Sequence, residues 1–153
     1  YVAEKWTGGL LTNFNTFRSR LEQLEQLEKL ERGELPSLKM ENLKKKEQVQ
    51  IRREKNKLLK NLGGIRTMKE RMPTAIIIVD PCYERTALLE ARKIGLVIIA
   101  LIDTDGNPEL VDIPIPCNDD SMRSISLIVG SLADAILAGR TKYLTKVKSD
   151  KRE

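Results

Sequence analysis

Pro73-Thr74-Ala75-Ile76-Ile77-Ile78-Val79-Asp80-Pro81 is the stretch that decides the fold. Its centre, Ala75 to Val79, is an unbroken apolar run rich in β-branched residues, and Asp80-Pro81 closes it. A short continuous apolar run bounded by turn residues is typical of a strand that is buried on both faces. We therefore expect this run to form a central strand of a parallel sheet.

The residues after this strand predict further units of the same sheet. Glu84 to Lys93 has the pattern of a helix that Gly95 ends, and Val97 to Ile102 predicts a second buried strand that ends at Asp103. Beyond a turn at Asp105-Gly106-Asn107-Pro108, the chain predicts a third short strand, Val111 to Ile115, and a helix, Met122 to Leu137. Asn118, Asp119 or Asp120 can cap that helix, and Gly139 can stop it.

Residues 13–62, which precede the sheet, predict a helical hairpin whose turn is Gly33-Glu34-Leu35-Pro36. Thr12 or Asn13 can cap the first helix, and Gly63-Gly64 predicts a left-handed cap at the end of the second. The apolar positions are Phe14, Phe17, Leu21 and Leu24 in the first helix, and Met40, Leu43, Ile51, Leu58 and Leu62 in the second. The second helix is otherwise heavily charged, so we expect the hairpin to project into solvent or onto a partner.

The predicted fold class is α/β, with a parallel sheet that is incomplete in this chain and would leave an edge exposed. We expect the absent strands to precede Tyr1, which would make the hairpin an insertion within one α/β domain. The expected parts are a motif segment of the α/β domain (1–12), the inserted hairpin (13–62), the sheet domain (63–140) and a polar C-terminal tail (141–153). The tail's charge predicts that it is flexible or ordered only by RNA.

Composition limits the possible functions of the chain. Its 153 residues carry 27 Lys and Arg against 22 Asp and Glu, and the resulting charge of +5 fits a polyanionic partner without requiring one. Aromatic residues make up 4% of the chain, too few for a base-stacking surface. The longest apolar runs are strand-sized, so no uninterrupted run suits a membrane span.

Three aspartates carry the strongest enzymatic alternative. Asp80, Asp103 and Asp112 lie at or near predicted strand ends, where doubly wound sheets bind ligands and where carboxylates can hold magnesium. A receiver-like or phosphatase-like enzyme using Asp80 and Asp103 is the alternative function. The competing explanation, which we favour, is that aspartates before a proline or a turn simply end strands, since no glycine-rich phosphate loop follows.

Cysteine chemistry has less support. Cys82 and Cys117 could each lie at a positive helix end, which would lower a thiol pKa. The sequence contains no His, however, and this removes the common base of cysteine and serine triads. The two cysteines also lack metal-ligand spacing, so we interpret them as small structural residues in a reduced compartment.

The segment Lys5-Trp6-Thr7-Gly8-Gly9-Leu10-Leu11-Thr12-Asn13 is the strongest candidate for phosphate binding, because amides beside glycines can approach an anion closely. Cations also gather on the hairpin, although glutamates alternate with them and such a run is usually a solvated face. The candidate RNA-binding residues are Lys5, Trp6, Gly8, Gly9, Thr12, Asn13, Arg18, Arg20, Lys44, Lys45, Lys46, Arg52, Arg53 and Arg66. Catalytic residues, metals and cofactors are not assigned.

Four segments in order resemble the bacterial-type ribosomal S-two family. They are Lys5-Trp6-Thr7-Gly8-Gly9 with Leu11-Thr12-Asn13; Leu62-Gly63-Gly64-Ile65; Pro73-Thr74-Ala75-Ile76 through Asp80 to Glu90; and Ile102-Asp103-Thr104 with Asn107-Pro108, leading to Ile115-Pro116-Cys117-Asn118-Asp119-Asp120. The resemblance covers Tyr1 through Arg140.

This resemblance implies a flavodoxin-like α/β domain with an inserted coiled-coil hairpin, and a non-catalytic, structural role in translation. Implied partners are small-subunit rRNA and neighbouring small-subunit proteins, with the S-one protein as a candidate neighbour; a membrane and a homo-oligomer are not implied. Similarity to plastid-encoded members around Asn107 to Asp120 favours a chloroplast ribosome, with the bacterial cytoplasm or a mitochondrion as alternatives.

Overall fold

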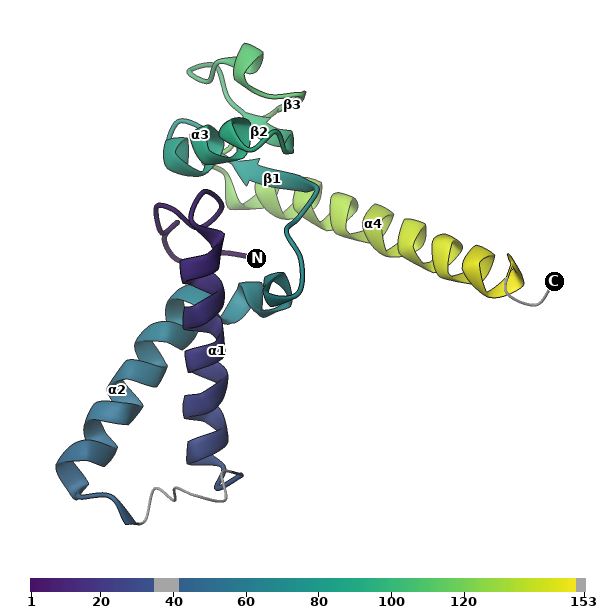
Figure 1. The fold of residues 1–153 in the computed structure, drawn as a ribbon. Coiled ribbons are helices and arrows are strands. Elements are labelled where there is room, and N and C mark those ends of the chain that lie inside the picture. The colour runs from purple at the N-terminus through teal and green to yellow at the C-terminus, as the bar shows by residue number, and fades with distance from the viewer. Residues whose placement is uncertain (35–41, 151–153) are drawn as a thin grey trace. The chain divides into compact units, whose positions relative to one another are not determined.

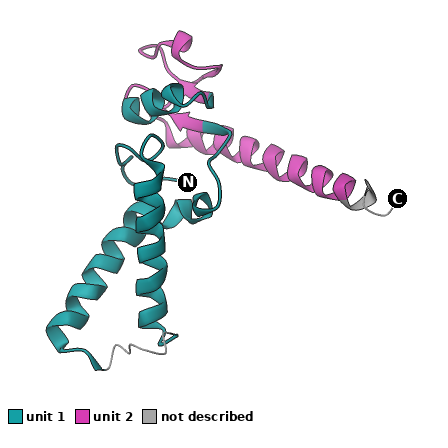
Figure 2. Cartoon of the chain, viewed as in Figure 1, with its two compact units in different colours: residues 1–76, 84–98 teal, residues 77–83, 99–153 magenta. Residues whose placement is uncertain are grey.

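The structure is a computed structural model that describes residues 1–34 and 42–150, the last three of these as backbone only (Figure 1). Its elements are α1 (Phe14–Glu31), α2 (Lys45–Leu62), the 3-10 segment η2 (Gly63–Lys69), β1 (Ala75–Val79), α3 (Arg85–Lys93), β2 (Val97–Ile102), the 3-10 turn η3 (Pro108–Leu110), β3 (Ile113–Pro116) and α4 (Met122–Asp150). Contacts divide the chain into two compact units (Figure 2). Unit 1 is Tyr1–Ile76 with Glu84–Ile98, and unit 2 is Ile77–Tyr83 with Ile99–Glu153.

The strands form one parallel sheet in the order β1-β2-β3, which confirms the α/β class. β2 pairs with β3 from Ile99 opposite Ile113 to Ile102 opposite Pro116. The first two strands have the predicted bounds, whereas the third begins two residues later than predicted. Pro114 and Pro116 fit an edge strand because proline cannot donate to a neighbour on its outer side.

The expectation that Ala75–Val79 is a central strand buried on both faces is wrong for this sheet. β2 is central and β1 lies at an edge, with only Ile78 of its residues buried. A continuous apolar run indicates that a strand is suited to burial, but it does not specify which neighbours flank it. Our expectation that further strands precede Tyr1 stays a prediction.

In unit 1, α1 and α2 pack side by side as the predicted hairpin (Figure 1). The buried residues of α1 are Phe17, Leu21, Leu24 and Leu30, and they form the apolar face of this helix. Gly33 ends this helix with a φ of 71°, a left-handed conformation that glycine adopts without a Cβ penalty. The rest of the predicted turn, Leu35 and Pro36, lies outside the described residues, as does Met40 of the second apolar face.

The predicted left-handed cap at Gly63-Gly64 is wrong. Gly63 has a φ of −58°, and the chain continues through η2. Gly64 meets a different requirement, since a Cβ at this position would lie 2.0 Å from the carbonyl oxygen of Tyr1. The glycine pair therefore permits a close approach of two backbone segments, a need that sequence cannot distinguish from a helix cap.

α4 is longer than expected, because it passes through Gly139 and continues to Asp150. The prediction that Gly139 stops this helix is thus wrong, and residues 141–150 continue α4, while 151–153 lie outside the described residues. That the tail is flexible or ordered only by RNA stays a prediction. One glycine costs a helix only about 1 kcal/mol relative to alanine, and the residues beyond it are mostly compatible with helix.

By its length and composition alone, the helical segment Met122–Val147 could span a membrane, because its mean hydropathy reaches 1.4. Counting uninterrupted apolar runs misses this segment because polar residues are spread along it. A soluble helix that packs an apolar face on protein can have the same average, so this property does not establish a membrane span.

Candidate nucleic-acid interface

The Trp6 to Thr12 segment in unit 1 is held by one buried carboxylate, that of Glu90 on α3. The amide of Gly9 donates to Glu90 Oε1 at 2.5 Å, and the indole Nε1 of Trp6 donates to the same oxygen at 3.4 Å. Glu90 Oε2 accepts from the amides of Leu11 at 2.9 Å and Thr12 at 3.3 Å, and from the Thr12 hydroxyl at 3.4 Å. The carboxylate thus supplies the anion around which the segment folds.

The environment of Glu90 favours its charged form. Burial raises the pKa of this carboxyl, but hydrogen bonds from Gly9, Leu11, Thr12 and Trp6 oppose that effect and hold the pKa below its ordinary value. An ionised carboxylate that accepts several amide hydrogen bonds is a stable internal anion. Both oxygens are occupied by donors of the segment.

This arrangement uses amides that we considered as phosphate donors. The amides of Gly9, Leu11 and Thr12 point to Glu90, so these donors are already used within the protein. A positive φ of 86° at Gly9 allows the backbone to turn there. Gly9 therefore lets the segment wrap around Glu90, while the Lys5 side chain of the same segment is exposed.

The hairpin cations divide into two classes by their contacts. On the inner side, glutamates of α1 bind cations of α2 and η2: Glu31 pairs with Lys55 and, at 3.9 Å, with Arg52. Glu28 accepts two hydrogen bonds from Arg66, at 2.7 and 3.0 Å, and Glu25 pairs with Lys69 at 2.6 Å. These three glutamates neutralise cations within the hairpin.

The remaining predicted hairpin cations lie on exposed positions. Arg18 pairs with Glu22 of its own helix at 3.6 Å, and Arg20 lies over the Phe17 ring at 5.7 Å. Lys44, Lys45, Lys46 and Arg53 are exposed, with no ion pair to another described residue. Of the predicted hairpin set, Arg52 and Arg66 thus pair with α1 from α2 and η2, and Arg18 pairs within its own helix. Lys44, Lys45, Lys46 and Arg53 are open to solvent.

Asn13 and Thr12 are also placed by the structure. Asn13 occupies the N-cap position of α1, yet its Oδ1 accepts from the Thr16 hydroxyl at 2.9 Å and caps no helix amide. Thr12 is engaged with Glu90 as described. Both residues make these contacts at the start of the hairpin. Like Lys5 and Arg18, both are exposed to solvent.

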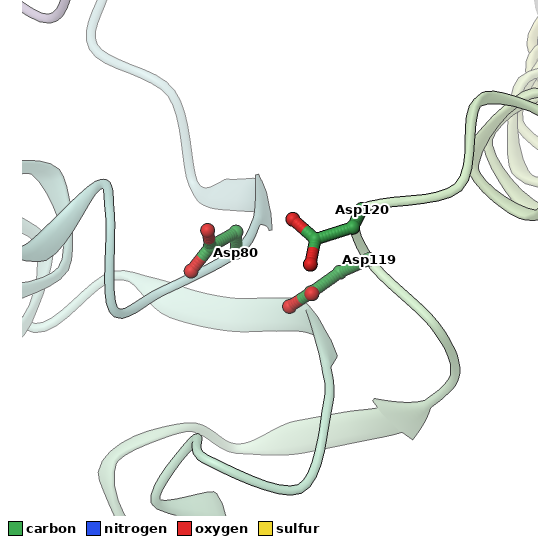
Figure 3. A group of neighbouring side chains, drawn as sticks. All are labelled: Asp80, Asp119 and Asp120. Atoms are coloured by element: carbon green, nitrogen blue, oxygen red, sulfur yellow. The ribbon is translucent and has the colours of Figure 1, made fainter.

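In unit 2, three carboxylates gather at the ends of strands (Figure 3). Asp80, Asp119 and Asp120 each offer an oxygen within 4.8 Å of the others. Burial raises the pKa of Asp119, and the neighbouring charge of Asp80 raises it further. Carboxylate oxygens at this spacing are the donors that Mg²⁺ and Ca²⁺ prefer, so these are the described residues that could hold a divalent cation.

The structure does not group the aspartates as the enzymatic alternative predicted. Asp103 is absent from this carboxylate group: its Oδ1 accepts from the Thr104 amide at 2.6 Å, and its own amide donates to Asp119 at 3.3 Å. Exposed Asp112 is likewise outside the group. Asp80 Oδ1 accepts from the amides of Cys82 and Tyr83, at 3.0 and 2.9 Å, as an Asx turn that reverses the chain after β1.

Both cysteines lie outside the helices and strands. Cys82 Sγ lies 3.5 Å from the Asp105 carbonyl oxygen, and neither cysteine forms a disulfide. Cys82 is exposed and Cys117 is half-buried.

Sequence reasoning missed Glu90 and the partners of Asp80. The available signal for Glu90 was a charged residue bordering the apolar face formed by Ala87, Leu88 and Ala91. Asp119 and Asp120 were interpreted as helix caps. However, they follow β3 as Asp80 follows β1, and the carboxyl ends of parallel strands share one edge.

Comparison with known proteins gives consistent matches along the chain. The family model described as "Ribosomal protein S2" matches residues 1–139. Small ribosomal subunit protein uS2c of Rhodomonas salina is 47% identical over 153 residues, which are all of this chain and 61% of that protein. Protein uS2 of Rhodopirellula baltica is 47% identical over 95% of this chain and 54% of its own length. Protein uS2 of Synechocystis is 49% identical over 92% of this chain and 50% of its own length.

The chain thus spans between half and about three fifths of these relatives. The matched region includes the Trp6 segment, the hairpin, the sheet and the first part of α4. Since the family model covers most of the 153 residues, and relatives are nearly half identical over almost the whole chain, the chain belongs to the Ribosomal protein S2 family.

Proposed function

We propose that the protein is a structural constituent of the small ribosomal subunit that binds small-subunit rRNA and supports translation. The observation that carries this proposal is the family match over residues 1–139. Nearly half-identical relatives named as small ribosomal subunit proteins add to it. The geometry is compatible, because the open cations of the hairpin present positive charge to solvent while the inner ones are neutralised.

RNA recognition on this surface would rest on phosphates and shape. The chain is 4% aromatic, which offers little for stacking on bases, whereas exposed Lys and Arg suit phosphate oxygens. Of the residues assigned from sequence, we retain Lys5, Arg18, Arg20, Lys44, Lys45, Lys46 and Arg53 as candidate phosphate contacts. Trp6, Gly8, Gly9, Thr12, Asn13, Arg52 and Arg66 then act by shaping the segment and the hairpin.

Finer features of the proposal follow the family resemblance. We propose that the sheet belongs to a flavodoxin-like domain, with residues 13–62 as an inserted hairpin and residues 1–12 and 63–140 as parts of the sheet domain. Neighbouring small-subunit proteins, with the S-one protein as one candidate, would be its protein partners, and neither a membrane nor a second copy is required. The uS2c relatives support a plastid ribosome, and the cyanobacterial relatives keep a bacterial one as the alternative.

The enzymatic alternative is not retained. The matched family is ribosomal and non-enzymatic, and the alternative's pair of Asp80 and Asp103 is not brought into one carboxylate group.

Sedimentation tests the proposed function. The tagged protein, run through a sucrose gradient at moderate salt and again with the subunits dissociated, should migrate with the small subunit in both conditions. Recovery at the top of both gradients would reject the proposal. A hairpin variant that sediments normally but loses a protein neighbour would show that the hairpin contacts protein.

A further inference from the structure

The outer side of α2 carries three cations in one row. Lys46, Arg53 and Lys57, here called the outer row, lie seven and four residues apart and therefore share one face of the helix. At 1.5 Å per residue, the row extends about 16 Å along the helix axis. All three residues are exposed, and none makes an ion pair with another residue in the described ranges.

The opposite side of α2 has a different character. Lys55, which lies half a helical circumference away from Lys46, is paired with Glu31 and keeps only 18% of its side-chain surface exposed. Ile51 and Leu58 are half-buried on this side, and Leu62 is buried. α1 thus covers both the apolar and the charged parts of the inner side.

The pairing leaves the row's positive charge uncompensated by α1. Glu25, Glu28 and Glu31 are committed to Lys69, Arg66 and Lys55. The acids of α2 itself, Glu47 and Glu54, keep their negative charge but form no ion pair with the row among the described residues. Glu47 accepts from the Lys44 amide at 3.1 Å, and Glu54 accepts from Gln23 at 2.7 Å. The cations of the row are about 6 and 10 Å apart along the axis, comparable with the Debye length of about 8 Å in physiological salt, so their potentials overlap.

We propose that the outer row is the part of the hairpin that contacts an RNA phosphate backbone, and that Arg52, Lys55 and Lys69 form an inner set that holds the hairpin together. The proposal rests on the proposed ribosomal function and refines it. It selects Lys46 and Arg53 from the hairpin cations retained above and adds Lys57 to them. Exposed cations without internal partners can displace the counterions of a polyanion, whereas cations already paired with carboxylates gain less.

Two variants with equal loss of charge test the division. The outer variant combines Lys46→Gln, Arg53→Gln and Lys57→Gln, and the inner variant combines Arg52→Gln, Lys55→Gln and Lys69→Gln. Each removes three positive charges from the protein, so a difference between them reports position and not net charge. The affinity of each protein for a small-subunit rRNA transcript is measured between 50 and 200 mM salt, and thermal unfolding is measured in parallel.

For the outer variant, the slope of log affinity against log salt should be smaller in magnitude by about 2 to 3, since each phosphate contact contributes about 0.7 to 0.9. Its melting temperature should stay unchanged. For the inner variant, the melting temperature should fall while the salt slope stays near that of the unmodified protein. A third variant with Arg53→Lys alone should keep the slope, because a point charge is sufficient for a phosphate contact.

Equal salt slopes for the outer variant and the unmodified protein would overturn the proposal. An equal decrease of the salt slope in both triple variants would also overturn it. Loss of small-subunit association without a change in rRNA slope would also overturn it, since the row would then contact protein. The sedimentation experiment separates this failure from that of the proposed function: if the unmodified protein migrates with the small subunit while the outer row does not affect the slope, only the row's role is rejected.

Discussion

The backbone amide of Gly9 donates a hydrogen bond to the carboxylate of Glu90 at 2.5 Å across 81 residues of sequence. The other donors to Glu90 come from Trp6, Leu11 and Thr12, so one side chain on α3 fixes a whole turn of backbone before α1. The charge of Glu90 and the shape of this segment consequently depend on each other.

Glu90→Gln should destabilise the protein by about 2 to 4 kcal/mol, because a neutral amide accepts weaker hydrogen bonds and turns an NH₂ group towards backbone donors. Urea unfolding measures the loss, and the NMR signal of the Trp6 indole N–H should shift. Glu109→Gln, which changes an exposed glutamate in the same way, is the control and should stay within about 0.5 kcal/mol of the unmodified protein. Equal effects of the two substitutions would contradict the role of Glu90.

The same carboxylate predicts a pH dependence. Since the pKa of Glu90 is lower in the folded state, its stabilisation is present above the ordinary value of 4.5 and is lost as pH falls through the folded pKa. The difference in stability between the unmodified protein and Glu90→Gln should therefore shrink below pH 4.5. A difference that grows on acidification would refute this sign.

Asp119→Asn should stabilise the protein at neutral pH. Burial and the charge of Asp80 raise the pKa of Asp119, so the ionised form at pH 7 opposes folding, while asparagine can still accept from the Asp103 amide. The gain should shrink as pH falls through the folded pKa and vanish below the ordinary value of 3.8, where Asp119 is protonated in both the folded and the unfolded state. Exposed Asp120→Asn is the matched control with a smaller expected gain, and a lower melting temperature for Asp119→Asn would contradict the prediction.

Gly106→Ala should cost about 1 to 3 kcal/mol, because the added Cβ would lie 2.3 Å from Cγ2 of buried Ile102. Gly130→Ala, in α4, is a control with the opposite sign. Apart from its chain neighbours and its own helix backbone, no atom of the described residues lies within 4 Å of its added Cβ, so a gain of about 0.5 to 1 kcal/mol from helix propensity is expected. Thermal unfolding of both variants gives the comparison, and a stabilising Gly106→Ala would exclude the close contact.

The Glu25 carboxyl should titrate at about pH 2 in the folded protein. Hydrogen bonds from Lys29 and Lys69 lower its pKa from 4.5 to about 2. Carboxyl NMR titration checks this value, and Lys69→Met or Lys29→Met should each raise the pKa towards 4.5. Lys60→Met, which removes a cation paired with Glu4, should leave it unchanged. An unperturbed Glu25 in the unmodified protein would mean that the pair with Lys69 does not form in solution.

Local patterns were sufficient for much of the fold. The bounds of β1 and β2 followed from their apolar runs, and Gly33 and Gly95 end helices with the positive φ expected of them. The position of β1 at a sheet edge depends on its neighbours, and the passage of α4 through Gly139 depends on a small energy difference. Neither is contained in a short window of sequence.

The candidate site was predictable to a smaller extent. Exposed cations could be chosen by residue type, but Lys46 and Lys55 are both lysines on one helix, and only the position of Glu31 separates an open cation from a paired one. Likewise, the glycines of the Trp6 segment were correctly singled out as places of close approach. Their anion proved to be Glu90, more than seventy residues away, which local sequence could not reveal.

Biosynthesis gives the long span between Gly9 and Glu90 a further consequence. The chain emerges from its N-terminus, so the Trp6 to Thr12 segment and the α1–α2 hairpin are made well before α3 supplies the carboxylate. The hairpin can form from contacts near in sequence, whereas the segment before it must wait for a late partner. Until then, water can hydrogen-bond the amides and the indole of the segment. The segment and α3, which both belong to unit 1, can come together only after Glu90 has been synthesised.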